Sequence, residues 1–91
     1  MLKLVTIELS GADLEAFDSY EAAVLAVLPE HGGRLELRVR AMDSSKETHL
    51  LYFPDEAAYE RFRADPRRTA VQDQWRRSGA TSSAIDVERL S

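Results

Sequence analysis

Four side chains in this sequence could contact a small ligand, and His49 is the one with the widest chemistry. It lies on the same face of an expected strand as Leu51 and Phe53. A histidine there could act as a general base or bind a metal or haem, or it could bond to a neighbouring side chain. Tyr52 and Trp75 could line a pocket mouth and hydrogen-bond a ligand, or pack against the sheet or a partner.

Arg38 is the fourth candidate, and it belongs to the charged face of an expected edge strand. The residues of that face are Arg34, Glu36, Arg38 and Arg40. Their guanidinium groups could bind the carboxylate of a ligand. The alternative is that the charges stay in water and keep the edge strand from pairing with other chains.

Few other residues point to a reaction. The chain has no cysteine, which excludes a disulfide, a thiolate metal site and a cysteine nucleophile. His31 and His49 lack the short spacing of a metal-ligand motif. Gly32 and Gly33 follow an expected helix instead of preceding one, so they form no phosphate-binding loop. The sequence predicts no metal and no cofactor, and it assigns no catalytic residue.

The elements that must position these side chains follow from the pattern of apolar residues. Strands are expected over residues 2–9, 34–41, 48–53 and 84–90. The first helix is expected to follow a capping box formed by Ser10 and Asp13, the second is capped by Asp55, and a short third helix is capped by Asp65. Residues 42–47 and 80–83 are expected to be loops. This order predicts an α+β, ferredoxin-like βαββαβ sandwich with an antiparallel sheet of order 4-1-3-2.

The first and third strands are apolar on both faces, whereas the second and fourth alternate between apolar and polar residues. This difference places the first and third strands in the centre of the sheet. The helices can cover only one face, so the other apolar face would be left in water. We therefore expect a homodimer in which a second copy covers that face about a two-fold axis.

Length and composition indicate one globular domain over residues 1–91. The net charge of -4 and the sequence pI of about 5.1 argue against nucleic acid as a partner. The longest apolar run, residues 22–28, is too short to cross a bilayer, and the N-terminus does not have the pattern of a secretory signal. We therefore expect no contact with a membrane and a cytoplasmic location.

Two stretches of the sequence carry a resemblance to a known superfamily. Residues 20–34 form a helix that exits through HGGR, and residues 51–59 form a strand that ends in Phe-Pro before a capped helix, with Asp-Pro at 65–66. These features resemble the ferredoxin-like dimeric α/β-barrel superfamily, most closely its uncharacterised bacterial branch. NIPSNAP-like and antibiotic-biosynthesis-monooxygenase-like proteins are its relatives. The resemblance covers residues 2–90 and implies two sheets that face each other as a barrel with the helices outside.

The superfamily includes enzymes and proteins without known activity, so the resemblance implies a fold and leaves the function open. The expected function is binding of a small apolar or aromatic molecule between the two sheets of the dimer, without a reaction. One alternative is a cofactor-independent monooxygenase or isomerase acting on an aromatic or polyketide-like substrate. Another is a haem-binding or haem-degrading protein that uses His31 or His49. Because His49 and Tyr52 point to opposite faces of one strand, at most one of them can lie on the barrel face.

Overall fold

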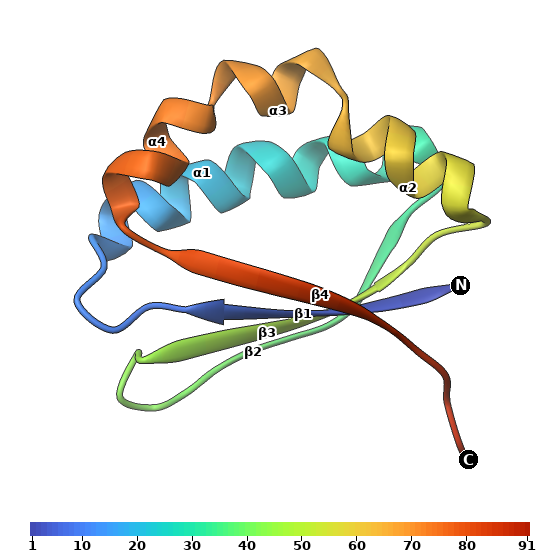
Figure 1. Ribbon diagram of the computed structural model, residues 1–91, viewed down its shortest axis with the longest axis horizontal. Coiled ribbons are helices and arrows are strands. Elements are labelled where there is room, and N and C mark those ends of the chain that lie inside the picture. The colour runs from blue at the N-terminus through green and yellow to red at the C-terminus, as the bar shows by residue number, and fades with distance from the viewer.

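The computed structural model describes residues 1–91 as a four-stranded antiparallel sheet with all the helices on one face (Figure 1). The sheet order is β2-β3-β1-β4, which is the expected 4-1-3-2 order read from the other edge. The expected ferredoxin-like α+β fold is therefore confirmed. The elements in chain order are β1 (Leu2–Glu8), α1 (Leu14–Val27), the 3-10 helix η1 (Leu28–His31), β2 (Arg34–Arg40), β3 (Lys46–Tyr52), α2 (Glu56–Arg63), α3 (Pro66–Ala70), α4 (Gln72–Ser78) and β4 (Thr81–Val87).

Both β3 and β4 begin earlier in the chain than the sequence predicted. Lys46 and Glu47 belong to β3 instead of the preceding loop, and β4 begins at Thr81 and ends at Val87. The cause is pairing with the central strand along its whole length, since Glu8 lies opposite both Lys46 and Thr81. Hydrogen bonding and packing beside a buried strand outweigh the weak strand preference of the residues themselves.

Aspartates fix where the helices start. The side chain of Asp55 accepts a hydrogen bond of 2.8 Å from a backbone N–H in the first turn of α2, and Asp65 accepts one of 2.9 Å at the start of α3. Both caps agree with the sequence-based expectation. The capping box expected from Ser10 is wrong, because Asp13 itself caps α1 and accepts from a backbone N–H of the first turn at 3.1 Å. These caps satisfy backbone donors that would otherwise be unpaired, and they hold the helices in place above the sheet.

The side of the sheet that faces the helices contains the core. Ile7 of β1, Leu51 of β3 and Phe53, which follows β3, are almost fully buried there. Phe17 and Phe62 reach down to this side from α1 and α2. None of the helices has the length and apolar composition needed to cross a membrane.

The opposite side of the sheet is bare, as Figure 1 shows. Leu4 of β1 pairs with Leu50 of β3, and Leu37 of β2 continues the row on the other side of Leu50. Leu37 and Val39 are each 49% exposed, and Ile85 of β4 is 59% exposed. We call this surface, formed by Leu4, Leu37, Val39, Leu50 and Ile85, the open apolar face.

A β-bulge in β2 changes the expected alternation of its side chains. The register shifts between Leu35 and Leu37, so Arg34 pairs with Tyr52 while Arg38 pairs with His49. The extra residue places Arg34 and Arg38 on opposite faces of the sheet. The prediction that the charged residues of this strand share one face is therefore wrong for Arg34.

Candidate functional site

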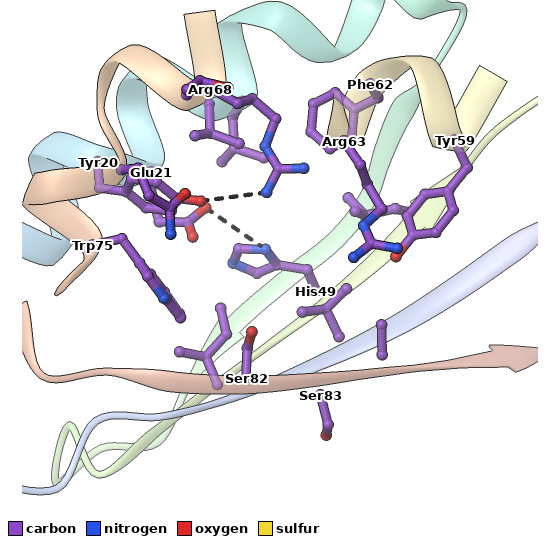
Figure 2. A pocket seen from close by; sticks show the side chains of 18 residues that line it. Tyr20, Glu21, His49, Tyr59, Phe62, Arg63, Arg68, Trp75, Ser82 and Ser83 are labelled. Atoms are coloured by element: carbon purple, nitrogen blue, oxygen red, sulfur yellow. Dashed lines mark hydrogen bonds and ion pairs between the residues drawn. The ribbon is translucent and has the colours of Figure 1, made fainter. Parts of the chain in front are cut away.

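A cavity of about 420 Å³ lies between the helices and the sheet (Figure 2). Tyr20, Tyr59, Phe62 and Trp75, from α1, α2 and α4, supply its aromatic walls, and strands β1, β3 and β4 supply its floor. Ten of its 18 lining residues are hydrophobic and the other eight are polar or charged, so the cavity combines apolar walls with groups that can hydrogen-bond a ligand. His49 is one of those polar groups.

His49 lies in the floor of the cavity and is only 3% exposed. Its Nε2 atom lies 2.5 Å from Oε2 of Glu47, and its Nδ1 atom lies 4.0 Å from Oε2 of Glu21. Glu47 is two residues away on the same strand, so its side chain points to the same side of the sheet. Glu21 comes down from α1, and a dashed line in Figure 2 joins it to the ring.

Glu47 is held in place by two arginines of the neighbouring strand. Arg38 Nε donates to Oε2 at 3.0 Å and Arg40 Nε donates to Oε1 at 2.8 Å. Burial would raise the pKa of Glu47, but the hydrogen bonds from His49, Arg40 and Arg38 outweigh it and leave the pKa below its usual value. Glu47 is therefore a charged, fixed acceptor for the histidine.

Burial favours the neutral forms of both Glu21 and His49. Burial raises the pKa of Glu21 from 4.5 to about 7, although the charge of Arg38 opposes the change. Burial also lowers the pKa of His49, against the effect of its hydrogen bond to Glu47. At neutral pH the ring is thus neutral and Glu21 is about half protonated.

This arrangement can move a proton. With Glu47 charged, the neutral ring donates its Nε2–H to Glu47 and keeps the lone pair of Nδ1 on the side of Glu21. An imidazole oriented by a carboxylate in this way is the usual form of a general base. Glu21 adds a second group that can gain or lose a proton near pH 7 beside the same cavity.

The four residues that the sequence singled out do not form one site. His49 and Trp75 line the same cavity, from β3 and α4. Tyr52 points to the other face of the sheet, where the guanidinium of Arg34 lies 4.1 Å from the centre of its ring. Arg38 lies outside the cavity lining and acts on it through Glu47.

Sequence reasoning missed Glu21, Glu47 and Arg68 as site residues. Glu21 carried a signal, because it is a carboxylate on the apolar stripe of its helix. Glu47 is separated from His49 by one residue, but the expected loop ended at Glu47 and hid this alternation. Arg68 lies in a locally basic stretch, and nothing there distinguishes it from the exposed arginines around it.

The residues of the cavity do not fit a haem group or a metal ion. One nitrogen of His49 is bonded to Glu47 and the other faces Glu21, so an iron could reach the ring only by displacing a carboxylate. His31, the other histidine, bonds to Asp65 through Nε2 at 2.8 Å and lies outside the cavity lining. No group of three or more histidine, aspartate or glutamate side chains is arranged to hold a metal ion.

Solved structures share this fold over nearly the whole chain. The cofactor-independent oxygenase SnoaB from Streptomyces nogalater matches with a TM-score of 0.72 and 17% identity, over 98% of this chain and 93% of that chain. A NIPSNAP family protein of unknown function from Agrobacterium tumefaciens matches with a TM-score of 0.70 and 17% identity, over 99% and 89%. The chain therefore shares the ferredoxin-like α+β fold of these proteins.

An uncharacterised NIPSNAP domain protein from Burkholderia xenovorans matches as well, with a TM-score of 0.66 and 17% identity over 100% of this chain and 98% of that chain. No family model and no curated protein matches the sequence. Because one fold can host many activities, these likenesses assign a fold to the chain and no reaction.

Proposed function

We propose that the cavity binds a small aromatic molecule and that the protein works as a homodimer. The observation that carries the first part is the cavity of about 420 Å³, which is walled by four aromatic side chains and is large enough for a small organic ligand. The sequence placed the ligand between the sheets of two subunits. The geometry instead favours the space between the helices and the sheet of one subunit.

Trp75 offers a direct test of ligand binding, because it is the single tryptophan of the chain and lines the cavity. Its indole N–H gives one NMR resonance, which should move when 2-naphthol is added to ¹⁵N-labelled protein. Ala84→Phe should weaken this binding, since Ala84 lines the cavity and a benzyl group there would occupy part of it. Thr81→Phe on the same strand lies outside the lining and is the matched control. An unmoved indole resonance at saturating 2-naphthol would contradict the proposal.

The open apolar face supports the homodimer. The helices pack on the opposite side of the sheet, and side chains such as Leu37 and Ile85 are about half exposed within one subunit. Contiguous apolar surface of this kind usually marks an interaction site. A second copy that packs sheet against sheet would cover it, because a two-fold axis matches the same surface on both subunits.

Sedimentation of Ile85→Asp tests this assembly. The side chain of Ile85 is largely exposed in the subunit, so the charge should leave the subunit folded but prevent two open apolar faces from meeting. Met42→Asp makes the same chemical change in the β2–β3 loop, at a fully exposed residue, and should remain dimeric. If the unmodified protein sediments as a folded monomer at micromolar concentration, the dimer proposal is wrong.

Proton transfer is a second candidate function, favoured by the buried His49–Glu47 pair beside the cavity. A neutral histidine that is fixed by a carboxylate could remove a proton from an acidic C–H or O–H group of a bound molecule that takes the place of Glu21 beside Nδ1. The exchange of the acidic C–H hydrogens of 2-tetralone in D₂O, followed by NMR, measures such a step. His49→Gln should abolish any acceleration by the protein. Equal exchange rates with and without the protein would remove this candidate.

A further inference from the structure

The guanidinium of Arg68 lies at the cavity with an incomplete set of partners. Its Nη2 atom donates to the hydroxyl of Tyr20 at 3.3 Å, and its Cζ atom lies 4.6 Å from the centre of the Phe62 ring. Its Nε atom is buried and has no hydrogen-bond partner. A buried donor without an acceptor costs free energy, and a ligand oxygen beside it would remove that cost.

Arginines elsewhere around the site are paired with carboxylates. Arg67, the adjacent residue, bonds to Asp65 through Nη2 at 2.8 Å, and Arg38 bonds to Glu47. Arg68 forms no ion pair with any carboxylate of the chain, although it is half buried. A positive charge that is partly removed from water favours an anion close to it.

The positive charge of Arg68 lies on the helix side of the cavity. In Figure 2 its guanidinium extends from α3 into the cavity, and His49 lies below it on the sheet. Trp75 lies on one side of the space between them, and Tyr59 and Arg63 lie on the other. An aromatic body could therefore occupy the apolar space while an acidic group meets Arg68 at the helix side.

We propose that the ligand of this cavity is a small aromatic carboxylate and that Arg68 binds its carboxylate group. This inference rests on the proposed function, since it names the class of molecule that the same cavity takes. A bound carboxylate would be repelled mainly by the negative charge of Glu21. Burial raises the pKa of Glu21 to about 7, so this carboxyl group is partly neutral near pH 7. Arg63 also lines the cavity, and its ion pair with Glu60 is long at 3.9 Å, so it adds a second positive charge.

Two ligands of the same shape test the proposal. 2-Naphthoate carries the carboxylate, and 2-naphthamide replaces it with a neutral amide. Titration against the Trp75 indole resonance should show 2-naphthoate binding about 10- to 100-fold more tightly, the range expected for a hydrogen bond to a charged group. Arg68→Met keeps the apolar part of the side chain, so it should remove this preference and leave the affinity for 2-naphthamide unchanged.

Two further variants control for charge and for folding. Arg61→Met removes an arginine of α2 that also has no ion pair but lies outside the cavity, so it should keep the preference. Arg68→Lys keeps the positive charge and should retain part of the preference, and the ¹⁵N spectrum of each variant reports whether it is folded. Equal affinity for the two ligands would overturn the carboxylate inference and leave the proposed function intact. Failure of both ligands to bind would overturn both.

Discussion

Replacing Glu21 by glutamine should make the protein more stable at alkaline pH. Glu21 is 6% exposed, and burial raises its pKa to about 7 from an ordinary value of 4.5. The unfolded chain loses the proton near pH 4.5, while the folded chain holds it until about pH 7. Because a raised pKa favours the protonated form in the folded state, stability is greatest below pH 4.5 and falls as pH rises towards 7.

The size of this effect follows from the two pKa values. One pH unit of difference corresponds to about 1.4 kcal/mol, so the shift from 4.5 to about 7 removes roughly 3 kcal/mol of stability at alkaline pH. Between about pH 5 and about pH 9 the unmodified protein should lose roughly 2 to 3 kcal/mol that Glu21→Gln retains. His49 titrates in both proteins, so its own contribution largely cancels in the comparison.

Urea unfolding followed by circular dichroism measures this difference. Both proteins should be compared at several pH values and at one fixed protein concentration, because the stability of the proposed dimer would depend on concentration. Glu88→Gln is the matched control, because it removes a carboxylate from the exposed residues after β4. It should show the same dependence of unfolding free energy on pH as the unmodified protein.

Parallel curves of unfolding free energy against pH for Glu21→Gln and the unmodified protein would refute this reasoning. A Glu21→Gln protein that is less stable at about pH 9 would refute it more strongly, since it would mean that the charged carboxylate is the stabilising form. Either result would also remove Glu21 as a group that exchanges protons near neutral pH.

Three further changes test the local structure by urea unfolding. Glu47→Gln removes the buried carboxylate that pairs with Arg38 and Arg40 and leaves them only the half-exposed Asp18, so it should lower the free energy of unfolding by roughly 2 kcal/mol, less than for a fully buried pair. An unchanged free energy of unfolding would mean that Asp18 and water are sufficient partners for the two arginines. Gly32→Ala should lower the free energy of unfolding more than Gly79→Ala does. Both glycines have φ above 70°, but a Cβ at Gly32 would lie 2.9 Å from Pro54 Cγ, whereas one at Gly79 would meet open space. Equal losses of unfolding free energy would contradict the contact with Pro54. Asp65→Asn should lower the urea midpoint at neutral pH, and the difference from the unmodified protein should shrink as pH falls below 3.8. The reason is that the hydrogen bonds from Arg67 and His31 hold the pKa of Asp65 well below that value. A difference independent of pH would show that the charge of Asp65 does not stabilise the fold.

The architecture was largely predictable because its signals are local. Alternation of apolar residues separated the two-sided central strands, such as the one that holds Leu50 and Leu51, from the one-sided edge strands. Aspartates before the second and third helices predicted the caps that Asp55 and Asp65 form. The errors also have a physical cause: the bulge in β2 inserts one residue, and an alternating sequence does not reveal such an insertion.

The sequence by itself determined the strand order, the caps of the second and third helices and an open apolar face, because each depends on residues within one element. Only the tertiary structure decided the site, because that depends on which elements meet across the sheet and the helices. Glu21, His49 and Arg68 come from α1, β3 and α3, and each looks like an ordinary polar residue in its own segment. Packing of these elements buries Glu21 and His49 and shifts the pKa of both, and it leaves the Nε atom of Arg68 buried without a hydrogen-bond acceptor.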